Sequence, residues 1–369
     1  MPENMAAWAV VKGRPLEIKS APYPTPKSNE IVVRNHSVAI NPVDWLLLNN
    51  GSMILKWLKY PVILGSDLAG EVVAVGSDVK RFKVGERILS FALGITKSSM
   101  DNRQGAFQLY PIIREDMASP IPDSMSYEEA SVLPLGMSTA ACGLYHKDHL
   151  ALQQPSTSAK SIGKTVLIWG GSTSVGSCAI QLAAASGYKV ITTCSPRNFT
   201  YVKRLGASQP FDYNSPTVVQ DIIAAFKGDE SAGALSIGKG AVEKCLDILA
   251  KCKGSKMVAM TSYAVQPNEI PVSIIGFIPL ALPLAKANLN IMWKRWMRGL
   301  ETSFVSGSAL EGNEVRKAVY VDFLPEALRQ GKVVPSPEPL IVGKGLGKIH
   351  EAFGLQKRGV SAKKVVVSL

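Results

Sequence analysis

The sequence has no closely paired cysteines and few histidines, and both absences limit its chemistry. Its five cysteines are scattered without a CxxC pair, and none precedes Cys142. This spacing excludes a zinc ribbon, predicts no disulfide framework and favours a reducing compartment. The chain has only four histidines. His146 and His149 are three residues apart on a predicted helix, but no third metal ligand accompanies them. We therefore interpret them as surface residues and expect no metal site.

Long apolar runs are also missing. The most apolar stretch, residues 270–285, contains three prolines and is too short to span a bilayer. The first fifteen residues lack the basic and then apolar regions of a signal peptide. These features predict a cytoplasmic protein without a transmembrane segment. A hydrophobic content of 46% excludes a disordered chain and is sufficient for two packed cores.

Acidic residues are too few to balance the basic ones, so the formal net charge is +12. The positive charge is spread along the chain, and its densest cluster covers residues 286–299. Such a balance suits an anionic lipid surface or an acidic partner protein as well as it suits nucleic acid. The charge therefore identifies no partner, and without a basic nucleic-acid motif we expect no nucleic acid.

Two kinds of pattern divide the chain. Short apolar runs at 30–40, 70–76 and 85–91, separated by turn residues, predict strands, whereas residues 126–145 predict a helix with a serine cap. Strand and helix then alternate: 164–169 predicts a strand, 173–187 a helix and 188–195 a second strand. This alternation is typical of a parallel sheet with crossover helices. The last thirty residues return to strand character, so the end of the chain is expected to rejoin the β-rich part.

The stretch Gly170–Gly176, "GGSTSVG", follows a predicted strand and opens a predicted helix. Backbone N–H groups at such a turn face an anion, and the helix dipole favours negative charge there. Gly171 and Gly176 allow a tight turn and close packing, while Ser172, Thr173 and Ser174 supply hydroxyl groups. The pattern is not a strict GxGxxG, but its place between strand and helix predicts a dinucleotide site.

The end of the second strand indicates which dinucleotide binds. An NAD site places a carboxylate there, whereas this chain has "CSPRN", with Ser195, Arg197 and Asn198 as donors. A 2′-phosphate fits these groups, so the sequence predicts NADPH. The alternative is an ordinary surface turn.

Several motifs in order resemble those of the medium-chain dehydrogenase/reductase superfamily. They are "NPVDW" at 41–45, "ILGSDLAGEVVAVGSDVKRFKVGERI" at 63–88, "LPLGMSTAACGLY" at 133–145, the glycine turn, and "GVSAKKVVV" at 359–367. Within it, residues 193–216 are most similar to the zinc-free, trans-acting enoyl reductases of fungi. The resemblance implies an α/β fold: a GroES-like catalytic domain at 1–135 plus 315–369, and a doubly wound Rossmann domain at 136–314.

The resemblance also implies a set of cofactor-binding residues that lie far apart in the chain. They are Pro42, Asp44, Thr139, Gly171, Ser172, Thr173, Ser174, Val175, Gly176, Ser195, Pro196, Arg197, Asn198, Tyr213, Val360 and Ser361. The histidine and glutamate of the relatives' zinc motif are replaced here by Ser66 and Asp67, so no metal is expected.

NADPH without a metal suits hydride addition to a carbon–carbon double bond conjugated to a carbonyl. Asp44, Trp45 and Thr139 are the candidate catalytic residues by resemblance. Asp44 either borders the nicotinamide or caps a helix, and Trp45 either shapes the substrate entrance or packs in the core. Relatives often carry Tyr or Lys as a proton donor where this chain has Leu46. The alternatives are a quinone or carbonyl reductase, or a non-catalytic nucleotide-binding and trafficking member of the superfamily.

The segment Ile270–Leu300 is apolar and contains tryptophan, and it has four basic residues but no acidic one. It could wall a pocket for a small apolar unsaturated substrate, contact a membrane or an acyl-carrier or polyketide synthase partner, or form a dimer interface. The sequence leaves these alternatives open. It also leaves open whether the protein is a monomer or a homodimer.

Overall fold

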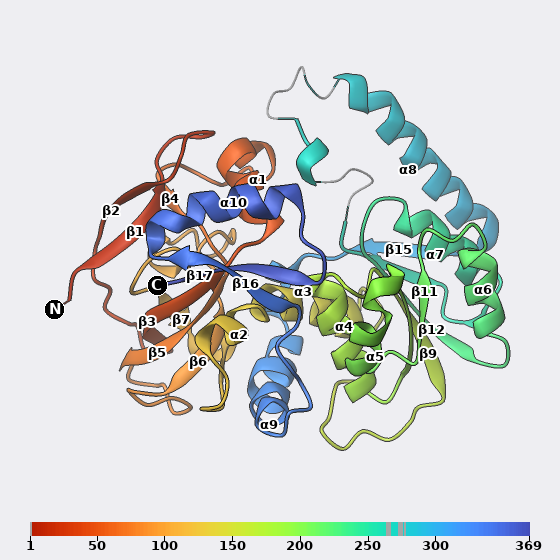
Figure 1. Cartoon of the computed structure of the whole chain (residues 1–369), viewed down its shortest axis with the longest axis horizontal. Coiled ribbons are helices and arrows are strands. Elements are labelled where there is room, and N and C mark those ends of the chain that lie inside the picture. Colours follow the sequence, from red (N-terminus) through yellow and green to blue (C-terminus); the bar gives the residue numbers. More distant parts are fainter. Residues whose placement is uncertain (1, 263–266, 272–275, 277) are drawn as a thin grey trace. The chain divides into compact units, whose positions relative to one another are not determined.

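The structure is a computed structural model that describes residues 2–262, 267–271, 276 and 278–369. The chain divides into two compact units (Figure 1). Unit 1 contains Met1–Leu135 and Tyr320–Leu369, and unit 2 contains Gly136–Val319. An antiparallel β-rich unit and a parallel α/β unit are the fold class that the sequence predicts.

Unit 1 is built on a mainly antiparallel sheet with the order β16-β17-β3-β5-β6-β8, and β7 also pairs with β3. These strands are β3 (Glu30–Ala39), β5 (Asp67–Val75), β6 (Arg87–Phe91), β7 (Ile112–Arg114), β8 (Ala118–Pro120), β16 (Glu338–Lys344) and β17 (Lys363–Ser368). A smaller sheet joins β1 (Asn4–Ala9), β2 (Glu17–Ala21) and β4 (Val62–Ile63). The tail's predicted strand character is confirmed, because β17 pairs antiparallel with β3.

Four α-helices accompany these sheets among the described residues. They are α1 (Pro42–Asn50), α2 (Tyr127–Ser131), α9 (Leu324–Arg329) and α10 (Ile349–Arg358). Short 3-10 turns cover Gly51–Met53, Asn102–Gln104, Glu115–Met117 and Leu346–Lys348, and Lys317–Phe323 is a π-helical stretch.

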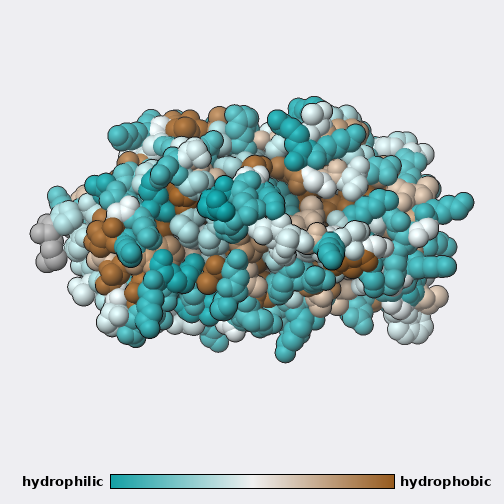
Figure 2. Space-filling model, turned by 90° about the horizontal axis from the view of Figure 1, so that it is seen from below, coloured by the Kyte–Doolittle hydropathy of each residue, from teal (hydrophilic) through white to brown (hydrophobic). Residues whose placement is uncertain are grey.

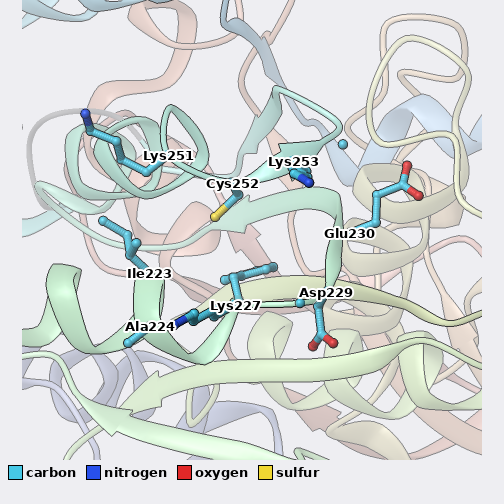
Figure 3. A pocket seen from close by; sticks show the side chains of 11 residues that line it. Ile223, Ala224, Lys227, Asp229, Glu230, Lys251, Cys252 and Lys253 are labelled. Atoms are coloured by element: carbon cyan, nitrogen blue, oxygen red, sulfur yellow. The ribbon is translucent and has the colours of Figure 1, made fainter.

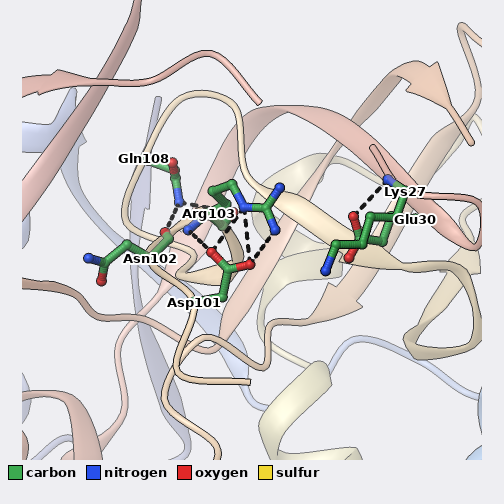
Figure 4. Close-up of polar contacts among 6 residues, drawn as sticks. All are labelled: Lys27, Glu30, Asp101, Asn102, Arg103 and Gln108. Carbon is green, nitrogen blue, oxygen red and sulfur yellow. Dashed lines mark hydrogen bonds and ion pairs between the residues drawn. The ribbon is translucent and has the colours of Figure 1, made fainter. Parts of the chain in front are cut away.

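The loop before β7 is held by polar contacts rather than by regular structure (Figure 4). The Asp101 carboxylate accepts hydrogen bonds from three groups of Arg103: Nη2 at 2.6 Å, the backbone N–H at 3.0 Å and Nε at 3.1 Å. The buried Gln108 amide nitrogen donates to the Asn102 and Gly105 carbonyls at 2.8 and 2.7 Å. The buried Gln108 amide group thus gains internal partners that help to fix the conformation of this turn.

Unit 2 has a parallel sheet with the order β11-β10-β9-β12-β14-β15, and β13 pairs with β12. Its strands are β9 (Lys164–Trp169), β10 (Lys189–Cys194), β11 (Gln209–Asp212), β12 (Glu230–Ser236), β13 (Lys253–Gly254), β14 (Met257–Met260) and β15 (Glu301–Phe304). Its helices are α3 (Pro134–Tyr145, which starts in unit 1), α4 (Ser174–Ala185), α5 (Phe199–Arg204), α6 (Val218–Ala225), α7 (Ala241–Leu249) and α8 (Ile278–Arg298), with 3-10 turns at Pro196–Asn198, Pro267–Glu269 and Gly307–Gly312. Helices α6 and α7 pack on the sheet through a core that includes Leu167, Ile191, Ile222 and Leu246.

Two local predictions are wrong. Residues 126–145 form two helices, α2 and α3, rather than one, because Pro134 cannot continue the hydrogen bonding of a helix that precedes it. The predicted cap is confirmed, since Ser126 Oγ accepts from the Glu129 N–H at 3.2 Å. His146 and His149 lie in the turn after α3 and not on the helix, and His149 Nδ1 is 2.7 Å from Ser303 Oγ.

No helix within the described ranges has both the length and the hydrophobicity that a membrane span needs. The face shown in Figure 2 is mainly hydrophilic, with small separate hydrophobic groups.

Candidate functional site

The glycine turn of unit 2 connects β9 to α4 at the carboxyl edge of the parallel sheet. Gly170 has a φ of +89°, which disfavours any residue with a side chain. Its N–H donates to Thr193 Oγ1 at 3.0 Å, and the Gly171 N–H donates to the Thr193 carbonyl at 2.8 Å. The turn is therefore fixed to β10, the strand whose end carries the predicted 2′-phosphate residues.

The predicted packing role of the glycines has a direct geometric basis. A Cβ at Gly171 would lie 2.1 Å from Thr192 Oγ1, and one at Gly176 would lie 2.2 Å from the Gly170 carbonyl oxygen. Both contacts are far inside van der Waals distance, so larger residues would force the strand and helix apart. Close approach of β9, β10 and α4 explains these glycines.

The three hydroxyl residues of the turn have different surroundings. Thr173 caps α4: its Oγ1 donates to the Gly170 carbonyl at 2.8 Å and accepts from the Gly176 N–H at 3.0 Å. Ser174 Oγ is buried without a hydrogen-bond partner, and Ser172 is half-buried. An unpaired buried hydroxyl costs free energy unless something binds it, so Ser174 is the hydroxyl that a ligand would satisfy.

Helix α3 brings Thr139 into the same part of unit 2. A Cβ at Gly136 would lie 2.7 Å from Ser174 Oγ, which places the start of α3 against the glycine turn. Thr139 follows one turn later and is 8% exposed. Gly307 lies against it, since a Cβ there would be 2.6 Å from Thr139 Oγ1.

The residues after β10 lie beside the predicted adenosine residue. Ser195 Oγ donates to the Tyr213 hydroxyl at 3.3 Å, although 18 residues separate the two. Arg197 and Pro196 are exposed in the 3-10 turn Pro196–Asn198, and Asn198 is buried. Tyr213 is 39% exposed. Among the predicted residues the structure therefore brings Ser195 and Tyr213 together at the end of neighbouring strands.

Three residues at this edge were not assigned to the site from the sequence, although Ser236 stands out there as a departure from relatives that often carry Asp. Lys244 Nζ donates to the Tyr213 carbonyl at 3.2 Å and lies 5.2 Å from the Trp169 ring centre. Asp212 pairs with Cys194 across β11 and β10. Ser236 Oγ, at the end of β12, is buried without a partner.

These residues were missed because they belong to neighbouring elements of the sheet. The carboxyl ends of β9, β10, β11 and β12 lie side by side in the sheet. This can be seen only when the strand order is known. Asp212 and Ser236 share one signal in the sequence, a polar residue as the last residue of a strand, whereas Lys244 lies within α7 and has no such signal. Burial, with Asp212 nearby, raises the pKa of the Cys194 thiol to about 11, so this cysteine is not a nucleophile.

Unit 1 contains a second polar cluster around the first turn of α1. The Asn41 N–H donates to Asp44 Oδ2 at 2.7 Å, which is the return bond of a capping box. Asp44 is fully buried, and its Oδ1 has no partner. Burial raises the pKa of Asp44 to about 8, with the nearby Asp67 carboxylate adding to the shift and the Asn41 N–H opposing it. The helix-capping alternative for Asp44 is thus present in the structure.

Asp67 and Lys364 form a buried ion pair beside Asp44. Lys364 Nζ lies 2.9 Å from Asp67 Oδ2, and their side chains are 5% and 0% exposed. Asn41 donates to Asp67 Oδ2 at 2.8 Å and accepts from Lys364 at 2.5 Å, while the Leu135 N–H donates to Asp67 Oδ1 at 2.6 Å. The carboxylate at the position of the relatives' zinc motif is therefore neutralised by an ammonium group.

The other predicted residues of unit 1 lie close to this cluster in sequence. Pro42 is the first residue of α1, and Leu46 is 9% exposed on the same helix. The Trp45 indole donates to Gln356 Oε1 of α10 at 2.5 Å, so Trp45 is packed and polar-anchored. Val360 and Ser361 lie between α10 and β17, half-buried and exposed respectively. No three potential ligands among His, Cys, Asp and Glu converge anywhere in the described ranges.

A pocket of about 650 Å³ lies elsewhere in unit 2, beside the amino end of β12 (Figure 3). Phe226, Lys227, Glu230 and Lys253 are among the residues that line it. None of the predicted cofactor residues contributes to it. The pocket lies at the amino edge of the sheet, whereas the glycine turn lies at the carboxyl edge. Nucleotides bind such sheets at the carboxyl edge, so this pocket is not the expected cofactor site.

Comparison with known proteins identifies the family. Residues 27–123 match the alcohol dehydrogenase GroES-like domain. The whole chain is 50% identical over 371 residues to dehydrogenase pigH of Monascus ruber, covering 100% of both chains. It is 38% identical to trans-enoyl reductase himH of Aspergillus japonicus, covering 99% of this chain and 97% of that protein. The chain therefore belongs to the medium-chain dehydrogenase/reductase superfamily.

Within that superfamily its relatives are fungal dehydrogenases and trans-enoyl reductases, as the resemblance indicated. Solved structures agree on the fold. CurK enoyl reductase matches with a TM-score of 0.72 at 19% identity, covering 100% of this chain and 99% of that chain. A quinone oxidoreductase of Pseudomonas syringae matches with 0.69 at 22% identity, covering 100% of both.

The family implies a nicotinamide cofactor, and the residues at the carboxyl edge of unit 2 fit one. Two buried hydroxyl groups, of Ser174 and Ser236, lack partners at this edge. The glycine turn leaves no room for side chains between the strand end and the start of α4. Lys244 adds positive charge beside Tyr213, and Arg197 adds another in the 3-10 turn that follows β10. Unpaired hydroxyls, a helix N-terminus and nearby cations together suit a dinucleotide with phosphate groups.

Proposed function

We propose that this protein is an NADPH-dependent reductase of carbon–carbon double bonds conjugated to a carbonyl. The observation that carries the proposal is the set of groups at the carboxyl edge of unit 2. The glycine turn, the unpaired Ser174 hydroxyl and the Ser195–Tyr213 contact lie there together. They provide a turn that can bind phosphate groups and, at the end of a strand, polar side chains for the adenosine end of the cofactor. A reductase needs both to bind its nucleotide.

NADPH rather than NADH is proposed because Lys244 lies beside Tyr213 and Arg197 follows the neighbouring strand end. Arg197 and Ser195 follow β10, and Lys244 reaches the Tyr213 carbonyl at 3.2 Å. The Asp212 carboxylate opposes them at the end of β11, and its Oδ1 already accepts from the Asn214 N–H at 2.9 Å. A charge-assisted contact to a 2′-phosphate contributes about 1.5–3 kcal/mol.

The residues proposed to hold the cofactor have separate tasks. In unit 2, Gly171, Gly176 and Val175 shape the turn, and Ser172 and Ser174 donate to phosphate groups, while Thr173 keeps α4 capped. Ser195, Pro196, Arg197, Asn198 and Tyr213 surround the adenosine end, and Thr139 approaches the turn from α3. Pro42, Val360 and Ser361 of unit 1 stay cofactor residues predicted by the resemblance alone, and Asp44 would contribute by holding the first turn of α1. When bound, NADPH supplies a hydride to the β-carbon of the activated alkene.

The protein's own part in the reaction is binding, orientation and exclusion of water. Trp45 is anchored by Gln356 and would present a fixed apolar wall to the substrate. Leu46 cannot donate a proton, so we propose that water reprotonates the α-carbon. Asp44 is too buried to reach substrate and acts by holding the first turn of α1.

The proposed substrate is a small apolar enone, enal or polyketide-like enoyl thioester of fungal secondary metabolism. The relative of Aspergillus japonicus is named a trans-enoyl reductase, and this supports an enoyl substrate. A substrate carried by an acyl-carrier or polyketide synthase partner is the version of the proposal that this relative favours.

Activity assays distinguish this proposal from its alternatives. The purified chain is offered NADPH or NADH, with a chelator present, and a panel of enones, enals, enoyl thioesters, quinones and ketones. Consumption of NADPH with formation of the saturated carbonyl product supports the proposal. Turnover restricted to quinones or ketones, or tight NADPH binding without any turnover on free or carrier-bound substrates, contradicts it.

A further inference from the structure

Helix α8 exposes an apolar stripe along its whole length. The stripe consists of Ile278, Leu282, Leu289, Met292, Trp293, Trp296 and Met297, each at least 55% exposed. At 100° per residue, six of the seven fall within an arc of about 100°, and Met297 extends it on one side. A monomeric soluble surface rarely gathers so many large apolar side chains in one place, so the stripe indicates an interaction surface.

The opposite face of α8 is the one that packs on unit 2. Ile291 contacts the hydrophobic core beneath α7. Lys294 Nζ and Arg298 Nη1 each lie 2.6 Å from the Asp247 carboxylate of α7. Figure 1 shows α8 running beside α7 on the outside of this unit. The helix is therefore fixed by one face while its apolar stripe points away from the core that holds it.

Charge decides what covers the stripe. No acidic residue occurs between Ile278 and Arg298, and Lys286 is exposed beside the stripe. The whole chain carries a formal charge of +12. A second copy would bring a basic helix against a basic helix, which like-charge repulsion disfavours. An anionic surface is complementary both to the helix and to the chain.

We propose that α8 is an interfacial anchor that lays its apolar stripe into the surface of an anionic lipid membrane. A helix that has basic residues, tryptophan and leucine but no acidic residue is typical of helices that lie in the plane of the bilayer surface. Trp293 and Trp296 suit the headgroup region, where an indole has an apolar body in lipid and a polar N–H in water. Such an anchor would lie in the membrane surface without crossing the bilayer.

Vesicle flotation tests the proposal with the full chain. The protein is mixed with vesicles of phosphatidylcholine and phosphatidylserine, or of phosphatidylcholine alone, and the floated fraction is measured. The test variant is Leu289→Ser/Trp296→Ser. The control is Val84→Ser/Ile341→Ser, which removes two apolar residues of unit 1 with 63% and 53% exposure. Tryptophan fluorescence is recorded in the same samples.

The native chain and the control should float with anionic vesicles and show a blue-shifted emission. The test variant should lose about tenfold or more in partitioning, because two large apolar contacts with lipid are gone. Lys286→Glu should weaken binding to anionic vesicles. Absence of flotation with anionic vesicles overturns the proposal, as does equal flotation of test and control variants. A dimer in light scattering that Leu289→Ser/Trp296→Ser abolishes also overturns it and assigns the stripe to a second copy.

Discussion

The ammonium of Lys364 lies 2.9 Å from Asp67 Oδ2 in the interior of unit 1, with Asn41 bonded to both. Lys364 comes from the last strand of the chain, while Asp67 begins β5. The pair therefore ties the carboxyl-terminal strand to the first half of the unit. Its burial makes each charge dependent on the other.

Removing one partner of this pair should be more costly than removing both. Lys364→Met leaves the Asp67 carboxylate buried without its counter-charge, and we expect a loss of roughly 3–5 kcal/mol in unfolding free energy. Lys364→Met/Asp67→Asn should recover much of that loss. Urea denaturation of both variants measures the difference. Equal stability of the single and double variants would contradict the role assigned to the pair.

Asp44 should make stability depend on pH. Its pKa is near 3.8 in an unfolded chain and about 8 in the folded protein. Between these values the folded state binds the extra proton, so stability falls as pH rises from about 4 to 8 and then levels off. Asp44→Asn keeps an acceptor for the Asn41 N–H and removes the titration.

The comparison between the native chain and Asp44→Asn is made by thermal unfolding at several pH values. Asp44→Asn should gain at least about 1 kcal/mol relative to the native chain between pH 5 and pH 8. A pH dependence that is the same in both proteins would show that Asp44 is already ionised in the fold.

Arg197 should discriminate between the two nicotinamide cofactors. Arg197→Ala is expected to weaken NADPH binding by about ten- to hundred-fold and to leave NADH binding nearly unchanged. Lys251→Ala is a matched control, because Lys251 is an exposed cation of the same unit in the pocket at the amino edge of the sheet. Titration calorimetry measures all four affinities. A loss of the same size for NADH would mean that Arg197 does not contact a 2′-phosphate.

Ser174 and Ser177 should respond differently to loss of their hydroxyl groups. Ser174 Oγ has no partner, so Ser174→Ala should leave the unliganded protein equally stable and weaken nucleotide binding several-fold. Ser177 Oγ donates to the Thr173 carbonyl at 2.8 Å and lies 2.8 Å from the Tyr201 hydroxyl, so Ser177→Ala should destabilise the unliganded protein by about 1 kcal/mol. Melting curves with and without NADPH separate the two effects. Unchanged nucleotide affinity in Ser174→Ala would remove that hydroxyl from the site.

The strand–helix alternation and the glycine turn could be predicted because both depend on local sequence. The period of apolar residues and the place of Gly170–Gly176 are properties of one stretch of chain. The ends of 126–145 were harder, because Pro134 both stops α2 and begins α3. Lys244 and Asp212 could not be assigned to the site from sequence, since their neighbours Tyr213 and Cys194 depend on the pairing of strands. The residues of the Lys364–Asp67 pair are almost three hundred positions apart in the sequence, and no local pattern predicts their contact.

We propose above all that this chain uses NADPH to reduce an activated alkene. The most direct test of this proposal follows NADPH and NADH oxidation with a chelator present, against an enoyl thioester and its saturated counterpart, with mass spectrometry of the product. We expect NADPH-selective consumption with the enoyl thioester and a product heavier by two hydrogen atoms. Consumption without a saturated product, or none at all with a carrier-bound and a free enoyl thioester, would contradict it.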